Sequence, residues 1–235
     1  GYDIDPGQAL IWLHAVSVGE TRAAQPLVSA LKARYPGHRI LLTHMTPTGR
    51  QASEELFGDG VLRAYLPYDY PFAVRRFLAH FRPAVGVIME TELWPNLVQA
   101  CKAQGIPLLL ANARLSEKSA RRYARFPNLT RSALRDLAGI AAQTEQDAAR
   151  LAALGAPEVA VLGNVKFDIL PPPEQLALGE GLRRRIGLRP VLLAASTREG
   201  EEALLFEALA KRLPGEALLV VVPRHPQRFD EVAGL

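Results

Sequence analysis

The chain has 235 residues, of which 49% are hydrophobic, 22% charged and 7% aromatic, and its formal net charge is +4. This balance is typical of a globular protein with enough apolar residues for one large or two modest cores, and it excludes disordered and fibrous classes. The longest stretch without a charged residue, 6–19, is shorter than the roughly 20 residues of a membrane-spanning helix. The single cysteine, Cys101, excludes an internal disulfide and favours a reducing, cytosolic compartment.

Short apolar runs alternate with amphipathic segments almost throughout the chain. The runs in the first part predict strands over residues 10–16, 39–43, 61–66, 84–89, 107–111, 139–142 and 159–162. The segments between them predict helices, because apolar residues recur there at helical spacing. This alternation is typical of βα units around a parallel sheet, so the fold class is α/β.

The pattern is interrupted by prolines 171–173 and then starts again. We predict strands over 191–195 and 217–222, separated by a helix over 199–213 with Ala203, Leu204, Ala208 and Leu209 facing inward. A further helical pattern begins at His225. We therefore expect a Rossmann-like domain over 1–165, a linker and crossing helix over 166–188, and the start of a second, incomplete Rossmann-like domain over 189–235.

Both chain ends are expected to be truncated. The chain begins with Gly1 rather than Met, and its last residues start a helical pattern without completing it. Two doubly wound halves predict a ligand cleft at the carboxyl ends of the strands, so polar residues that directly follow a strand are the candidates for chemistry.

The first candidates follow the first strand, in the run His14-Ala15-Val16-Ser17-Val18-Gly19-Glu20. Ser17 and Glu20 have the spacing of a capping box, in which both side chains bond the first turn of a helix. Alternatively, Glu20 is a general base at the mouth of the cleft, where Gly19 allows close approach of a substrate. A helix N-terminus lowers a carboxyl pKa, so we expect Glu20 to be ionised and a weak base unless the site is partly dry.

The densest cluster follows the fourth strand, with Glu90, Glu92, Trp94 and Asn96 in seven residues. Glu92 could merely favour the dipole of a helix that starts near Pro95. Glu90 follows an apolar run and needs a partner or a shifted pKa. Two neighbouring carboxylates favour glycosyl transfer or glycoside hydrolysis.

Further polar residues follow other predicted strands, and each alone is more often a helix cap than a site. They are Arg50, Asn112, Arg114, Lys166, Ser196, Thr197, Arg224 and His225. Ser196 to Glu199 again has capping-box spacing, and a helix N-terminus there could hold a phosphate. The motifs of dinucleotide-binding dehydrogenases, P-loop NTPases, zinc enzymes and common Ser hydrolases are absent from the sequence.

The charge is unevenly distributed, with seven cations and one anion between residues 114 and 135. Lys118, Arg121, Arg122 and Arg125 recur at the i, i+3, i+4, i+7 spacing that puts them on one helical face. This face is either ordinary solvated surface or a surface that binds phosphates or an anionic membrane.

Seven motifs occur together in one order along nearly the whole chain. They are His14 to Glu20, Thr48-Gly49-Arg50, Pro67-Tyr68-Asp69, Glu90-Thr91-Glu92-Leu93-Trp94-Pro95-Asn96, Asn112 to Ser116, Gly163 to Asp168, and Pro223-Arg224-His225-Pro226. In this order they resemble the 3-deoxy-D-manno-octulosonic acid (Kdo) transferase family, and the fourth motif is the most specific.

The resemblance implies an inverting GT-B glycosyltransferase that moves Kdo from CMP-Kdo to a lipid A precursor, lipid IVA, in lipopolysaccharide synthesis. It implies no metal, no cofactor and no nucleic-acid partner. It also implies action at the cytoplasmic face of the bacterial inner membrane, with an N-terminal anchor that this chain lacks. We add the hypothesis that Lys118, Arg121, Arg122 and Arg125 contact the anionic membrane surface.

Roles carried over by the resemblance fall into three groups. Glu20 would be the general base and Glu90 the second essential carboxylate. The acceptor side would be formed by Ser17, Gly19, Arg50, Glu92, Asn96, Asn112 and Arg114. The donor side would be formed by Lys166, Ser196, Thr197, Arg224 and His225.

The sequence departs from the family pattern at two donor-side positions. Ala195 precedes Ser196 where the family has Gly, and Gln227 follows Pro226 where Glu is usual. Two rival functions share the predicted architecture or surface. One is a nonhydrolysing sugar-nucleotide epimerase, and the other is a non-catalytic module that binds anionic lipid.

Overall fold

The computed structural model describes residues 8–90, 92–169, 171–210 and 212–235. The chain divides into two compact units, residues 1–170 and 171–235. The first unit thus extends to residue 170, where the sequence predicted a domain bound at 165. All the predicted strands are present, and their ends agree with the prediction to within two residues.

The first unit is built on a parallel sheet of seven described strands. They are β1 (Leu10–His14), β2 (Arg39–His44), β3 (Leu62–Tyr65), β4 (Val85–Met89), β5 (Leu108–Ala113), β6 (Gly139–Ala142) and β7 (Ala160–Val161). The order across the sheet is β3-β2-β1-β4-β5-β6-β7, so the chain winds outward in one direction from β1 and in the other from β4. These two strands pair directly, with His14 opposite Ile88, and their carboxyl ends form the switch point where such sheets bind ligands.

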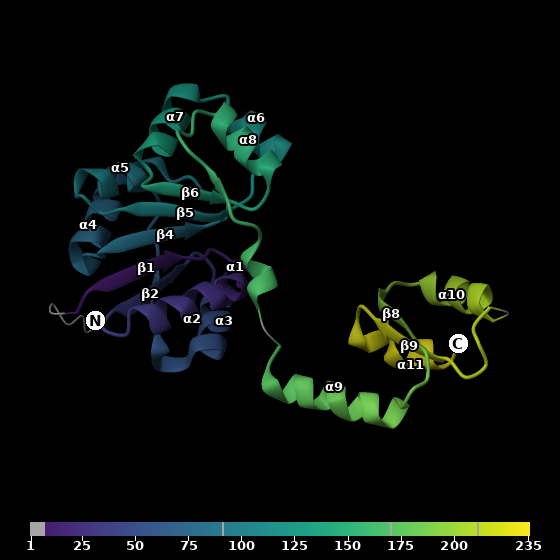
Figure 1. Ribbon diagram of the computed structural model, residues 1–235. Helices are drawn as coiled ribbons and strands as arrows, with labels where there is room; N and C mark the ends of the chain where they lie inside the picture. Colours follow the sequence, from purple (N-terminus) through teal and green to yellow (C-terminus); the bar gives the residue numbers. More distant parts are fainter. Residues whose placement is uncertain (1–7, 91, 170, 211) are drawn as a thin grey trace. The chain divides into compact units, whose positions relative to one another are not determined.

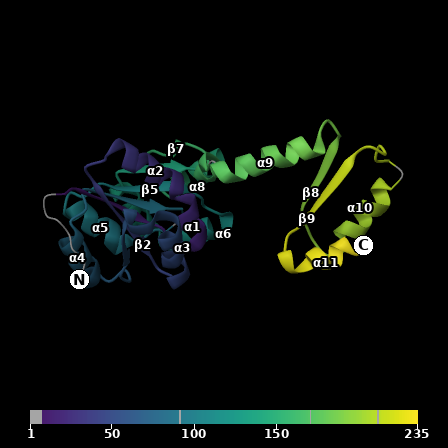
Figure 2. The same cartoon turned by 90° about the horizontal axis from the view of Figure 1, so that it is seen from below.

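Helices cover both faces of this sheet (Figures 1 and 2). They are α1 (Val18–Ala23), α2 (Gln25–Arg34), α3 (Pro47–Phe57), α4 (Pro71–Phe81), α5 (Pro95–Ala103), α6 (Glu117–Tyr123), α7 (Pro127–Asp136) and α8 (Glu145–Ala153), with 3-10 turns η1 (Gly58–Gly60) and η2 (Val165–Asp168). Side chains alternate along each strand, so Trp12 joins the core under α4 and α5, whereas Leu13 joins the core under α2.

Trp12 shows how closely the first core is packed. Its indole contacts Phe77 with ring centroids 5.4 Å apart. A Cβ on Gly86 of the neighbouring strand would come within 2.7 Å of this indole, so only glycine fits there. The Trp12 Nε1 donates to Thr43 Oγ1 over 2.8 Å, which satisfies the buried N–H.

The N-terminus of α5 is capped from a distant loop. Trp94, its N-cap residue, makes no side-chain capping bond. Instead, Asp69 accepts hydrogen bonds from the backbone N–H groups of Asn96 (2.9 Å) and Leu97 (2.8 Å), while the Asn96 amide donates to the Asp69 carbonyl over 2.7 Å. This network fixes the start of the helix that follows the two cluster carboxylates.

We expect Asp69→Ala to destabilise the first unit by about 1–2 kcal/mol, because it leaves two helix N–H groups without their acceptor. Asp69→Asn should cost less, since one amide oxygen remains. The measurement is the free energy of unfolding in urea, with Asp59→Ala in η1 as the control. Equal stability of Asp69→Ala and the unmodified chain would show that the cap contributes nothing.

The second unit contains α9 (Pro173–Ile186), a parallel strand pair β8 (Val191–Thr197) and β9 (Leu218–Pro223), α10 (Glu201–Leu209), η3 (Pro226–Arg228) and α11 (Phe229–Ala233). The predicted inward face of its second helix is wrong, because Ala203, Leu204 and Ala208 are exposed. Glu202 is fully buried instead and forms a two-pronged ion pair with Arg228 at 2.9 and 3.2 Å. The hydrogen bonds from Arg228 hold the pKa of the Glu202 carboxyl down to about 2. Residue 211, in the predicted helix, lies outside the described residues.

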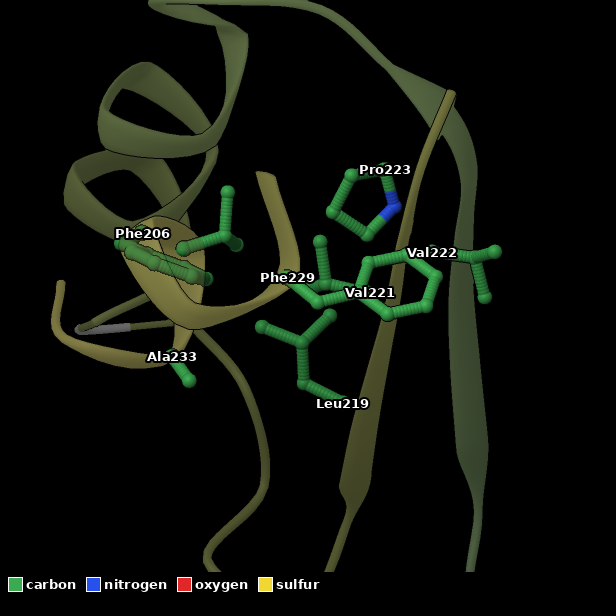
Figure 3. A pocket seen from close by; sticks show the side chains of 8 residues that line it. Phe206, Leu219, Val221, Val222, Pro223, Phe229 and Ala233 are labelled. Carbon is green, nitrogen blue, oxygen red and sulfur yellow. The ribbon is translucent and has the colours of Figure 1, made fainter. Parts of the chain in front are cut away.

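An apolar pocket of about 520 Å³ lies between β9, α10 and α11 of this unit. Figure 3 shows the side chains that line it: Phe206, Leu219, Val221, Val222, Pro223, Phe229, Val232 and Ala233. None of them carries a charge or a hydrogen-bonding group, and none is a predicted donor-binding residue. The pocket therefore lacks the groups that a nucleotide phosphate requires.

Candidate active site

Glu20 lies in the first turn of α1, directly after β1 at the switch point. Its Oε2 accepts a hydrogen bond from the Val16 N–H (2.8 Å) and its Oε1 from the Ser17 hydroxyl (3.1 Å), while the Glu20 N–H donates to Ser17 Oγ (3.3 Å). The capping-box geometry predicted for these residues is therefore present. It holds the carboxylate in one orientation at the rim of the sheet.

The pKa of the Glu20 carboxyl is raised to about 7. Burial is the largest cause, and the charges of Glu90 and Glu92 act in the same direction; the bonds from Val16 and Ser17 oppose them. The sequence predicted an ionised, weak base unless the site is partly dry, and burial of Glu20 makes the second alternative the one that holds. A carboxylate with a pKa near neutrality is well matched to general base catalysis.

Glu90 follows β4 and adopts a left-handed backbone conformation, with φ of 61°. Its N–H donates to the carbonyl of Ala111 on β5 over 2.9 Å. The Glu90 Oε1 lies 3.8 Å from Nζ of Lys166, so the partner that a carboxylate at this position required is a lysine from η2. A residue other than glycine in this conformation is strained, and such strain is often retained at functional sites.

Glu92 and Trp94 link the candidate site to α6. Burial raises the pKa of Glu92, while the Trp94 indole acts in the opposite direction. The phenol of Tyr123 at the end of α6 also has a raised pKa because of burial, opposed by a hydrogen bond to the backbone of Leu93. The segment that carries Glu92 therefore packs against the helix that carries the predicted basic face.

His14, at the end of β1, packs against Trp94 of this segment. It is fully buried at the end of β1, and its Nδ1 lies 2.9 Å from Thr43 Oγ1. Burial is the main reason that its pKa falls to about 3, so the imidazole is neutral. Its ring meets Trp94 edge-on at 5.9 Å. His14 is therefore a packing residue between β2 and the Trp94 loop.

Asn112 is the second-to-last residue of β5 and also has a left-handed backbone (φ 53°). Its Oδ1 accepts from the Val165 N–H (3.1 Å), and its carbonyl accepts from the side-chain amide of Gln143 (3.0 Å). Gln143 Oε1 in turn accepts from the side-chain amide of Asn164 (3.0 Å). The sequence reasoning missed Gln143, although it directly follows β6 and meets the criterion used for the other candidates.

Three other acceptor-side predictions lie on α3, after β5 and in α1. Arg50, in α3, pairs with Glu54 at 3.2 Å and lies over the ring of Tyr65. Arg114 is exposed after β5. Around Gly19, an added Cβ would meet only Ser17 Oγ, at 3.8 Å, so the backbone there is open to a ligand. Roles for these residues, and for Asn96 beyond its bonds to Asp69, stay predictions.

In the second unit, Ser196 and Thr197 end β8 beside Arg224 at the end of β9. The Arg224 N–H donates to the Thr197 carbonyl over 2.9 Å, and Ser196 has a positive φ of 61°. His225 precedes η3. The carboxyl ends of the two strands thus gather four of the five predicted donor residues, whereas the fifth, Lys166, lies in η2 of the first unit beside Glu90.

The capping box predicted for Ser196 and Glu199 is wrong. The N-cap of α10 is Gly200, with φ of 85°, and the Arg198 N–H donates to the Glu201 side chain over 2.8 Å. Because Glu201 and Glu202 occupy the first turn, their charges disfavour a phosphate at this helix end. Any anion site in this unit must rely on the strand ends instead.

Within the described ranges, no three His, Cys, Asp or Glu side chains gather in a way that could hold a metal ion. No helix in the part of the chain that the structure describes has the length and hydropathy to cross a membrane.

The sequence was compared with known families and proteins. Residues 2–169 match the family model described as 3-deoxy-D-manno-octulosonic-acid transferase (kdotransferase). The chain belongs to the Kdo transferase family. Curated relatives include the 3-deoxy-D-manno-octulosonic acid transferases of Bordetella pertussis, 48% identical over 97% of this chain and 55% of that protein, and Haemophilus influenzae, 41% identical over 96% and 54%. The chain therefore spans about half the length of these Kdo transferases.

Solved structures share the fold at low sequence identity. UDP-GlcNAc 2-epimerase from Neisseria meningitidis aligns with a TM-score of 0.62 and 16% identity, covering 97% of this chain and 68% of that one. A glycosyltransferase from Rickettsia africae aligns with a TM-score of 0.58 and 15% identity, covering 97% and 64%. The α/β fold of the GT-B class, with Rossmann-like units, is thus confirmed for this Kdo transferase family member.

Proposed function

We propose that the complete protein is an inverting glycosyltransferase that moves Kdo from CMP-Kdo to the lipid A precursor lipid IVA. The observation that carries this proposal is Glu20: a half-buried carboxylate at the switch point, fixed by two hydrogen bonds, with a pKa of about 7. Membership of the Kdo transferase family supports the donor sugar. The acceptor and the nucleotide rest on the resemblance of the motifs.

In the proposed reaction, Glu20 accepts the proton of an acceptor hydroxyl as the hydroxyl oxygen attacks the anomeric carbon of Kdo. The bond from that carbon to the CMP phosphate oxygen breaks, its electron pair leaves with CMP, and the configuration inverts. Glu90, held beside Lys166, is the second essential carboxylate. Ser196, Thr197, Arg224 and His225 would bind CMP, and the Arg224 guanidinium would stabilise the leaving phosphate without a metal.

The reaction is proposed to occur at the cytoplasmic face of the bacterial inner membrane, because the lipid acceptor resides in a membrane. The direct test is transfer of labelled Kdo from CMP-Kdo to tetraacylated lipid A precursor by the complete protein, with EDTA present. Labelled lipid is the expected product. Turnover of UDP-GlcNAc without lipid would instead favour the epimerase, and lipid binding without any turnover would favour the non-catalytic module.

The basic face of α6 supports a lipid partner. Lys118, Arg121 and Arg122 lie on α6, but the helix ends at Tyr123, so Arg125 lies in the turn after it and the predicted single helical face is interrupted there. Together with Glu117, these four side chains line a pocket of about 360 Å³. Glu117 neutralises only Arg121, through a contact of 2.5 Å. Directly beyond this face, Phe126 and Leu129 are 65% and 53% exposed, so cationic and apolar groups lie together as at a membrane interface. We propose that this face binds the phosphates of an anionic lipid surface.

Reversing the charges of Arg121, Arg122 and Arg125 to Glu is expected to weaken binding to vesicles with anionic lipid roughly 100-fold or more, since each cation near such a surface contributes about 1 kcal/mol. The acceptor KM should rise while kcat stays within about threefold. Vesicle sedimentation and transfer kinetics measure both effects. The matched control reverses Arg183, Arg184 and Arg185 at the end of α9. Equal binding by both triple variants would show that the basic face of α6 is ordinary solvated surface.

A further inference from the structure

The segment that follows β7 crosses the carboxyl ends of the sheet. β7 is the edge strand beside β6, yet Val165 in η2 packs against the core cluster that contains Leu13, Val28 and Val87 of β1, α2 and β4. Residues 162–165 therefore pass from the edge of the sheet back to its centre, as the green chain in Figure 1 shows beyond the ends of β6 and β5. This path brings Lys166 to the rim where Glu90 lies.

Three side-chain amides hold the segment on that path. Gln143, which follows β6, donates to the Asn112 carbonyl and accepts from the Asn164 side chain, each over 3.0 Å. Asn112 Oδ1 accepts from the Val165 N–H, and Asn164 Oδ1 accepts from the Lys166 N–H over 3.0 Å. Gln143 is the only one of the three that bonds both of the others, so it joins the strand end to the crossing segment.

The hydrogen bonds of these three amides matter for chemistry because of the charges at the carboxyl ends of the strands. Glu90 and Glu92 both act electrostatically on Glu20, so three carboxylates share the switch point. Lys166 is the cation paired with one of them, with its Nζ 3.8 Å from Glu90 Oε1. At that separation and with half of the lysine side chain exposed, the ion pair by itself does little to hold the ammonium group, because water screens exposed ion pairs. The backbone of η2 must therefore supply the placement of the ammonium group.

We propose that Gln143 is a positioning residue for the carboxylate site: it ties Asn112 to Asn164 and so holds Lys166 against Glu90. The inference rests on the proposed function for its effect on transfer, but the tie itself is a property of the first unit alone. In the part of the chain that the structure describes, the hydrogen bonds of the Gln143 side chain go to Asn112 and Asn164, and its proposed effect on the three carboxylates runs through Lys166.

Gln143→Leu tests the tie, because leucine keeps the volume and loses both hydrogen bonds. In the complete protein we expect kcat to fall roughly 10- to 100-fold with acceptor KM changed less than threefold, as for a small misplacement of a catalytic group. In a Lys166→Met background, the same substitution should lower kcat by less than about threefold further, because the group that Gln143 positions is already gone. Equal losses in both backgrounds would overturn the proposal.

A second readout does not depend on activity. Amide hydrogen exchange of Val165 and Lys166 in this chain should be at least tenfold faster in Gln143→Leu, while Gln104→Leu, an exposed glutamine at the end of α5, should leave it unchanged. If Gln143→Leu fails to fold, Gln143→Glu replaces it, since its carboxylate can still accept from Asn164. Unchanged exchange would overturn the inference whatever the kinetics show. If exchange is faster in Gln143→Leu but the unmodified protein transfers no Kdo, the proposed function is wrong and the role of Gln143 in holding residues 164–166 still stands.

Discussion

Glu20→Gln is expected to lower kcat for Kdo transfer by about 10³-fold, while the acceptor KM changes less than threefold. The proposed base loses its ability to accept a proton, and general base catalysis typically contributes 10²- to 10⁴-fold. Glutamine also serves at this position of a capping box, so its oxygen can still accept from the Val16 N–H and the fold should persist. The measurement is the initial rate of transfer from CMP-Kdo to tetraacylated lipid A precursor.

The control for this substitution is Glu145→Gln, a carboxylate in the first turn of α8 that lies outside the proposed site. It should leave kcat within twofold. If Glu20→Gln kept more than about a tenth of the activity, Glu20 would be a helix cap only, and Glu90 would become the candidate base.

The same carboxylate predicts the pH dependence of both activity and stability. Because Glu20 must be ionised to act, kcat/KM should rise about tenfold per pH unit below 7 and level off above it. The folded state raises this pKa above the ordinary value of 4.5, so the protonated form is favoured by folding. Its contribution to stability is fully present below pH 4.5 and is lost as the pH rises through 7. The urea midpoint should therefore fall between pH 5 and pH 8, and this fall should be larger for the unmodified chain than for Glu20→Gln.

Glu90→Gln is expected to lower kcat at least 100-fold, because it removes the charge that faces Lys166 while keeping the shape of the side chain. A second variant, Glu90→Gly, should abolish transfer and yet stabilise the chain by up to about 1 kcal/mol. At φ of 61° a side chain costs about 1–2 kcal/mol that glycine avoids, and the ion pair that is lost is partly exposed and weak. Stability is measured by urea unfolding alongside the transfer assay.

Arg82 provides a matched control for the backbone effect. It is also a residue other than glycine with a left-handed backbone, at the C-terminus of α4. Arg82→Gly should stabilise the chain by a similar amount and leave transfer unchanged. If Glu90→Gly were destabilising while Arg82→Gly was not, contacts of the Glu90 side chain would contribute more to folding than the structure indicates. Retained activity in Glu90→Gln would remove Glu90 from the proposed mechanism.

The fold class and the strands follow from local sequence patterns, and so does the choice of most candidate positions. Apolar runs at the spacing of strands and helices depend only on local composition, so all the strands were found with small errors at their ends. The rule that chemistry follows strand ends located Glu20, Glu90 and Asn112, and the order of the motifs identified the Kdo transferase family. The same rule applied once more after β6 would have found Gln143.

Tertiary structure decided what these residues can do, because pKa values and helix orientation depend on distant groups. The desolvation that raises the pKa of Glu20 comes from packing at the switch point and outweighs the hydrogen bonds from Val16 and Ser17. The pairing of Glu90 with Lys166 joins residues 76 positions apart through a chain crossing that no local pattern encodes. Likewise, α10 turns Glu202 inward for Arg228, against its apolar spacing. Local sequence fixes which residues reach the rim, whereas long-range contacts fix their charge and their partners.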